Sequence, residues 1–311
     1  MKPIALRLLK ILAYGAVGLA TGYFALELIR RFNDIPAVPW NATTAGVALL
    51  SCLAGVLVVA LIGTMWTLLL RDQGVHLPLT QAVQIVAVSQ IGKYLPGNVG
   101  HFAGRAVLAQ QAGVPLGVSA STLLIETAWT LAIGAGFSVV ALALFIDAAT
   151  AVALPAVNLL HLGLLTVGLL ALPWLGIHVV NRLAPGLSRK VGAGKLVAAP
   201  RLVTALMVSG LMAVCFFVLG AVVALHATQL FGVPGVSWFT LTMLFTSAWL
   251  VGYVVPGAPG GLGVREAMMV VVLTPAVGAG AAVGLGVTVR LATLAGDVLA
   301  FLLGLWSQRR P

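Results

Sequence analysis

Long runs of apolar residues constrain this chain more than any other feature. A helix that crosses a bilayer needs about 20 predominantly apolar residues, each adding roughly 1.5 Å. The composition, 61% hydrophobic and 8% charged, is not that of a water-soluble domain. We therefore predict an all-α polytopic membrane protein. Its expected spans lie at about residues 8–29, 47–70, 117–146, 158–181, 202–228 and 280–306.

Two further apolar stretches, at about 79–112 and 238–276, are interrupted near their centres. The first contains LPGNVG at 95–100, and the second contains PGAPGG at 256–261. Proline removes a backbone donor and glycine frees the backbone, so neither helix is expected to run straight through. Broken backbone at membrane depth is tolerated where it faces protein or a water-filled cavity. These stretches therefore predict two re-entrant helical hairpins that border a cavity.

Basic residues gather at three places outside the predicted spans. They precede the first span, fill the loop at about 182–201 and end the chain. Six crossings put the three clusters on one side, and basic loops are typical of the cytoplasmic side. Arg30 and Arg31 then fall outside, against this rule. We expect a multi-pass protein of the bacterial inner membrane with both termini in the cytoplasm.

An internal repeat relates the two halves of the chain. Each half, at about 8–147 and 158–306, is predicted to hold three spans and one hairpin. Because three is odd, the halves are expected to be inverted relative to each other, as in many secondary transporters. A shift of 160 positions pairs Gly92 with Gly252, Pro96 with Pro256, Gly97 with Gly257, Gly100 with Gly260 and Arg105 with Arg265.

Several ionisable residues lie in the apolar stretches, where each charge costs at least about 2.5 kcal/mol at the membrane centre. One interpretation is that they pair as structural salt bridges, with Glu126 and Glu266 as the candidate partners of Arg290. The other is an anion site, because a half-helix that begins after a Pro-Gly break offers free N–H groups to an anion. Arg105 and Arg265 would add forked donors suited to a phosphate. The predicted substrate-binding residues are Lys93, Pro96, Gly97, Gly100, Arg105, Glu126, Pro256, Gly257, Gly260, Arg265, Glu266, Arg290 and Asp297.

Other classes of function find little support in the sequence. A nucleophile elbow, an HExxH motif, a CxxC motif and a P-loop are all absent, so we expect neither an enzyme nor a cofactor or metal site. The net charge of +10 comes mostly from the loop clusters, so no nucleic-acid partner is expected. Cys52 and Cys215 lie inside apolar runs and are interpreted as small hydrophobic side chains.

Two motifs resemble those of a known family. The sequences KYLPGNVGHFAGR at 93–105 and PGAPGGLGVREA at 256–267, together with Arg290, resemble the lysylphosphatidylglycerol synthase transmembrane-region family, also called the flippase-like domain family. The resemblance covers nearly the whole chain. It implies a region that moves a lipid with a modified headgroup between leaflets. Because the chain ends at Pro311, it also implies a stand-alone member whose lipid-modifying synthase is a separate partner.

Three hypotheses about function follow from these features. The first is a lipid flippase that holds an anionic or phosphate-bearing headgroup through Arg105, Arg265 and Lys93. The second is a secondary transporter of small or organic anions that uses the same helix N-termini. The third is a membrane scaffold without transport activity. Glycine-rich spans also allow close packing between subunits, so a homo-oligomer is a further expectation.

Overall fold

The computed structural model describes residues 3–95, 99–150, 159–192 and 194–308, and within these ranges it contains helices but no strands. Five of the helices are long and apolar enough to cross a membrane, or six if one bent pair counts as a single span. The predicted all-α polytopic membrane fold is confirmed. The five lie at Ala42–Asp72, Leu116–Leu142, Leu202–Gln229, Pro259–Val277 and Ala279–Gln308, and the bent pair is Val167–Leu183 with Pro185–Val191.

Each half of the chain contains one interrupted helix pair, as its proline and glycine clusters predict. The segment Pro259–Val277 belongs to the second pair, and its length suits a full crossing, which the sequence analysis did not expect there. The first half contains α1 (Pro3–Arg30), η1 (Phe32–Asp34), α2 (Ala42–Asp72), α3 (Leu79–Gln90), η2 (Ile91–Tyr94), α4 (Gly100–Gln111) and α5 (Leu116–Thr150). The second half contains α6 (Leu159–Leu183), α7 (Pro185–Val191), α8 (Leu202–Gln229), α9 (Trp238–Val254), η3 (Pro259–Gly261), α10 (Val264–Val277) and α11 (Ala279–Gln308).

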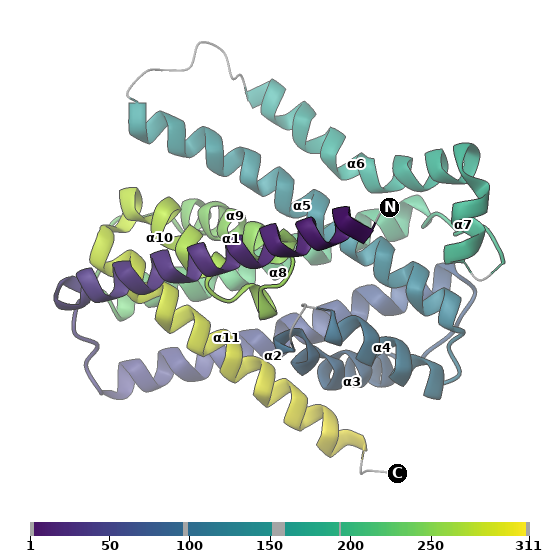
Figure 1. Cartoon of the computed structure of the whole chain (residues 1–311). Helices are drawn as coiled ribbons and strands as arrows, with labels where there is room; N and C mark the ends of the chain where they lie inside the picture. The colour runs from purple at the N-terminus through teal and green to yellow at the C-terminus, as the bar shows by residue number, and fades with distance from the viewer. Residues whose placement is uncertain (1–2, 96–98, 151–158, 193, 309–311) are drawn as a thin grey trace.

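The helices of the two halves follow the offset of the sequence repeat. Helices α2 and α8 begin at Ala42 and Leu202, and α3 and α9 begin at Leu79 and Trp238. Helix α5 packs on α9, and α11 packs on α3, so each half lays its last long helix against the broken pair of the other half. Figure 1 shows the α3–α4 pair toward the right and the α9–α10 pair toward the left. The inverted repeat and the orientation of the halves in a bilayer stay predictions.

Two repeat-related glycines let each broken pair fold back tightly. A Cβ on Gly92 would lie 2.6 Å from the backbone of Gly100, and one on Gly252 would lie 2.8 Å from the Cβ of Arg265. The half-helices can therefore cross only where these positions lack a side chain. The tips of the two pairs meet, because η2 contacts η3. Both breaks thus face protein, as a break at membrane depth requires.

Buried apolar clusters fill the space on either side of the meeting tips. One cluster joins α8, α9, α10 and α11 around Phe245 and Leu285, and another joins α2, α3 and α4 around Trp66 and Val86. A third cluster joins α5 to α8 around Phe216. The broken helices are therefore held in position by ordinary close packing, and the polar groups concentrate between the clusters.

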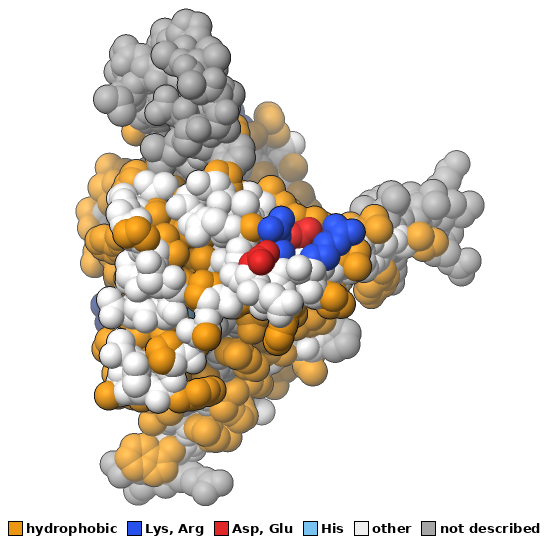
Figure 2. Space-filling model, turned by 90° about the vertical axis from the view of Figure 1, so that its left-hand side faces the viewer, with side chains coloured by type: hydrophobic (Ala, Val, Ile, Leu, Met, Phe, Trp, Pro, Cys, Tyr) orange, Lys and Arg blue, Asp and Glu red, His pale blue; other side chains and the backbone are white. Residues whose placement is uncertain are grey.

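The basic residues that oppose the predicted topology, Arg30 and Arg31, form ion pairs with acidic neighbours. Arg31 lies 2.8 Å from a carboxylate oxygen of Glu27, and it also pairs with Asp34. Arg30 lies 3.9 Å from Glu27. Figure 2 faces the end of the molecule at which α1 ends, and charged side chains form one small patch on that face. The three basic clusters on the other side outnumber this one, so they decide the predicted topology.

Chemical labelling would test this topology. The first residues of α1, the last residues of α11 and α7 lie toward the same side of Figure 1. In a variant without Cys52 and Cys215, single cysteines at His76, Lys195 and Gln308 should react with an impermeant thiol reagent only from the cytoplasmic side. A cysteine at Ala37 should react only from outside. Labelling of Lys195 and Ala37 from one side would contradict the predicted crossings.

Candidate functional site

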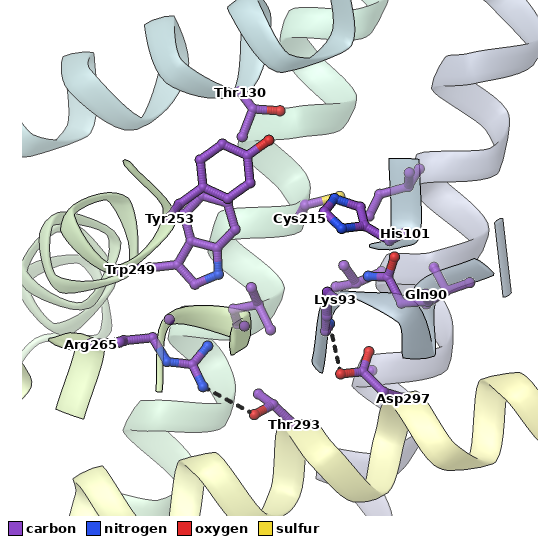
Figure 3. A pocket seen from close by; sticks show the side chains of 18 of the residues that line it. Gln90, Lys93, His101, Thr130, Cys215, Trp249, Tyr253, Arg265, Thr293 and Asp297 are labelled. Atoms are coloured by element: carbon purple, nitrogen blue, oxygen red, sulfur yellow. Dashed lines mark hydrogen bonds and ion pairs between the residues drawn. The ribbon is translucent and has the colours of Figure 1, made fainter. Parts of the chain in front are cut away.

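A cavity of about 160 Å³ lies where the two helix breaks meet. Side chains from both halves of the chain reach it, as Figure 3 shows, so neither half could form it alone. One part of its wall is polar and charged, and another part is apolar. The polar lining consists of Gln90, Lys93, Tyr94, His101, Arg105, Glu126, Thr130, Tyr253, Arg265, Arg290, Thr293 and Asp297.

Arg105, on α4, is paired within its own half. Its Nη1 donates to the Glu126 carboxylate on α5 at 2.7 Å, and its guanidinium lies 5.4 Å from the ring centroid of Trp66. Arg105 is only 3% exposed. A buried, charge-assisted hydrogen bond of this length is strong, and removing one partner would leave an uncompensated charge. Glu126 therefore partners Arg105.

Lys93 and Tyr94 close the other side of the cavity by sharing one carboxylate. Lys93 Nζ lies 2.7 Å from Asp297 Oδ2, and the Tyr94 hydroxyl donates to the same oxygen at 2.5 Å. Lys93 and Tyr94 belong to η2, at the first helix break, whereas Asp297 lies on α11. The lysine–aspartate bridge, drawn in Figure 3, thus fastens the tip of the first hairpin to the last helix of the second half.

Arg290 holds the second break in place. Its Nη1 donates to the Gly260 carbonyl at 2.8 Å and lies 3.6 Å from a carboxylate oxygen of Glu266. Of the two carboxylates proposed as its partner, the structure selects Glu266, because Glu126 is engaged by Arg105. Gly260 has a positive φ of 55°, which turns its carbonyl into this position at little cost for glycine.

Arg265 is the most weakly satisfied cation of the site. Its Nη2 lies 3.4 Å from the Thr293 hydroxyl, a contact drawn in Figure 3, and its Nε lies 3.5 Å from Glu266 Oε1. Both distances exceed the usual range for a charge-assisted hydrogen bond, which is about 2.7–2.9 Å. Yet Arg265 is only 7% exposed. A buried guanidinium with such long contacts retains donors for a further acceptor.

The described part of the site carries more positive than negative charge. Lys93, Arg105, Arg265 and Arg290 are set against Glu126, Glu266 and Asp297, that is, four bases and three acids. Several buried polar atoms also lack a hydrogen-bond partner among the described residues: His101 Nδ1, Arg105 Nε, Arg265 Nε and Glu266 Oε1. Three of these four atoms belong to basic side chains. An anion entering the cavity would find both an excess charge and free donors.

The N-terminus of α10 does not present all of its N–H groups to the cavity. The Gly263 N–H donates to Glu266 Oε2 at 2.6 Å, which caps the helix from within. The structure thus places a carboxylate where the sequence-based hypothesis expected an anionic ligand. At the first break, Pro96 and Gly97 lie outside the described residues. Helix α4 begins at Gly100, where a Cβ would clash with the Gly92 carbonyl oxygen. Gly100 is not among the residues that line the cavity.

The predicted site residues therefore separate into two groups. Pro256 and Gly257 are not part of the described cavity lining, and Gly257 lies instead beside the ring of Tyr14. Glu266 is buried behind the lining and contacts it through Arg290. The predicted residues that do line the cavity are Lys93, Arg105, Glu126, Gly260, Arg265, Arg290 and Asp297.

Comparison with known proteins identifies the fold family. The family model described as the lysylphosphatidylglycerol synthase TM region matches residues 8–300. The chain belongs to this family. The match spans both broken helix pairs and every charged residue of the cavity. A search of the curated proteins found no match.

In this member of the lysylphosphatidylglycerol synthase TM-region family, the site also contains residues that sequence reasoning missed. Tyr94 shares Asp297 with Lys93, and its ring lies 5.5 Å from the Arg290 guanidinium. Trp66, from α2, covers Arg105. Tyr94 is adjacent to the predicted Lys93 at the helix break, which is a usable signal. Trp66 lies within an ordinary apolar run, and nothing in the sequence distinguishes it.

The Arg105–Glu126 pair can be tested by a double-mutant cycle. Arg105→Gln or Glu126→Gln alone should destabilise the protein by on the order of 3–5 kcal/mol, because each leaves a buried charge unpaired. The double variant should recover part of this loss. Thermal unfolding in detergent would measure the coupling, and the partly exposed Asp72–Arg201 pair would serve as the control with weaker coupling. Additive losses at Arg105 and Glu126 would contradict the pairing.

Proposed function

We propose that this protein is a lipid translocase that moves an anionic or phosphate-bearing lipid between the leaflets of the membrane. The observation that carries the proposal is a buried cavity lined by four bases and two acids, with Glu266 behind the lining and a weakly held arginine, Arg265. A buried excess charge is costly unless it is compensated. An anionic headgroup would compensate it and use the donors that are free in the described structure.

The cavity wall suits an amphiphile better than a fully hydrated ion. Besides the charged groups, the lining includes apolar side chains from α2, α8 and α9. A phosphate-bearing headgroup would contact the bases while the first carbon atoms of the tail pass along this apolar wall. The volume of about 160 Å³ fits a headgroup and leaves the rest of the lipid in the bilayer. The apolar residues are Val58, Val59, Ile62, Met212, Phe216, Leu219 and Trp249.

The basic residues have different roles in this proposal. Arg265 binds the headgroup directly, because among the described residues its guanidinium has no hydrogen bond shorter than 3.4 Å. Arg105 contributes its charge and one free Nε, while its pairing with Glu126 keeps it in position. Lys93 is a second ligand for the headgroup whenever it exchanges Asp297 for the phosphate. Arg290 holds the backbone of the second break, where it bonds Gly260.

In the cell, the protein would act in the bacterial inner membrane with both termini in the cytoplasm. It would carry out no chemical step of its own. A lipid-modifying synthase is a proposed partner, because the family is described as the TM region of such an enzyme. The alternative of a small-anion transporter uses the same charges but needs no apolar wall, so substrate competition distinguishes the two.

Lysine substitutions would test the roles of the two repeat-related arginines. Arg265→Lys keeps the charge but loses the planar fork, so lipid transport should fall about ten- to a hundredfold, the worth of one charge-assisted hydrogen bond. Compared with Arg265→Lys, Arg105→Lys should reduce the transport rate less and the stability of the protein more. The measurement is flipping of fluorescent phosphatidylglycerol in proteoliposomes, with phosphatidylcholine as the neutral lipid.

Protein yield and the unfolding temperature in detergent control for misfolding in this test. Flipping of the anionic lipid at the wild-type rate by a well-folded Arg265→Lys variant would remove Arg265 from the headgroup site. Uptake of radiolabelled phosphate without any lipid flipping would instead support the small-anion transporter.

A further inference from the structure

A second cavity lies between α5, α6 and α7, away from the charged site. Helix α6 packs mainly on α5, and Figure 1 shows it at the edge of the molecule. The space between the two helices has a volume of about 610 Å³. We call it the α5–α6 groove. Most of its lining is apolar, and it includes Leu124, Ala128, Ala132, Leu172, Gly176 and Val180.

Helix α5 separates this groove from the charged cavity. Glu126 and Thr130 line the charged cavity, whereas Ile125, Ala128 and Ala132 line the groove. Residues that differ by one or two positions on a helix point in different directions. The groove is therefore a distinct site, and it does not depend on the proposed function of the charged cavity.

Polar groups close one end of the groove by bonding to one another. Ser188 donates to the side-chain oxygen of Asn181, and the Val197 N–H donates to the Ser188 hydroxyl at 2.9 Å. The Asn181 side chain donates to the Val197 carbonyl at 2.9 Å. These groups are satisfied internally, so the groove itself offers an occupant an apolar surface.

Exposed bases adjoin groove-lining residues in the sequence at the closed end of the groove. Helix α6 bends by 114° into α7 there. Arg182, Arg189 and Lys190 are exposed and adjoin the groove-lining residues of this bend, and Lys195 lies two residues before Val197. A short helix with exposed bases beside an apolar surface is typical of a segment at the membrane interface. Positive charge there attracts anionic headgroups at about 1 kcal/mol per Lys or Arg.

We propose that the α5–α6 groove binds an anionic phospholipid, with an acyl chain along α5 and α6 and the headgroup against Arg189 and Lys190. The charge pattern selects this occupant. A second copy of the same face would bring like charges together, which opposes association. A neutral transmembrane helix would leave the bases without a counter-charge. An anionic phospholipid, with apolar acyl chains and a negative headgroup, meets both parts of the surface.

Glycines on α6 offer a matched pair of variants. An ideal Cβ at Gly176 or at Gly168 would meet nothing within 4 Å, so neither replacement forces a clash inside the protein. Gly176 lines the groove, whereas Gly168 is not among the lining residues. Gly176→Leu should therefore fill the groove, and Gly168→Leu should add the same side chain elsewhere on the same helix.

The test measures how phosphatidylglycerol raises the unfolding temperature of the purified full-length protein in detergent. Phosphatidylglycerol should stabilise the wild type more than phosphatidylcholine does, and inorganic phosphate should have no effect. Gly176→Leu should reduce the difference, and Gly168→Leu should keep it. Arg189→Gln should weaken the apparent affinity about fivefold. Arg71→Gln, which removes an exposed base at the end of α2, should leave it unchanged.

Three results would overturn the proposal. Equal stabilisation of Gly176→Leu and wild type would place the lipid elsewhere, and equal effects of the two lipids would remove the role of charge. A change of oligomeric state in Gly176→Leu, without a change in lipid response, would assign the groove to a second copy. Each result is independent of flipping activity, so failure of the translocase proposal would leave this test intact.

Discussion

The pairing of buried charges is the constraint on which the rest of this structure depends. Each carboxylate of the cavity joins separate elements: Glu126 links α5 to α4, and Asp297 links α11 to the first helix break. Glu266 caps α10 and faces Arg290 on α11. Unpaired charges at membrane depth are costly, so these pairs fix how the two broken helix pairs meet. The cavity and the fold therefore stabilise each other, and the site cannot be removed without loosening the helix packing.

The sequence predicts the fold far better than it predicts the site. Apolar runs and Pro-Gly clusters act locally, so the long helices and both interruptions could be located from composition and spacing. The partner of Arg290 could not, because Glu126 and Glu266 are both acids in apolar stretches and only packing decides between them. Trp66 was missed for the same reason, since a tryptophan in an apolar run carries no local signal of its contact with a guanidinium.

The broken helix pairs of the two halves begin at nearly matching positions of the sequence repeat, whereas the side chains between them are asymmetric. Arg105 and Arg265 occupy matching positions, yet Arg105 has a carboxylate at 2.7 Å, whereas the polar contacts of the Arg265 side chain within the described ranges are 3.4 and 3.5 Å long. Lys93 corresponds at the repeat offset to Tyr253, a residue with no cationic group. The two halves therefore build one site with a firmly held side and a loosely held side. Such a division lets one side preserve the structure while the other exchanges ligands.

At the second break, Glu266 contacts both the residues that hold the structure and the arginine proposed to bind the ligand. It caps α10 through Gly263, faces Arg290, and is the nearest carboxylate to Arg265. One carboxylate cannot fully neutralise two guanidinium groups, and Glu266 Oε1 has no hydrogen bond among the described residues. An anion bound to Arg265 would free Glu266 to satisfy Arg290, which in turn holds the Gly260 carbonyl. Ligand binding would thus tighten the second break itself, and occupancy of the cavity would be coupled to the backbone that any alternating-access motion must bend.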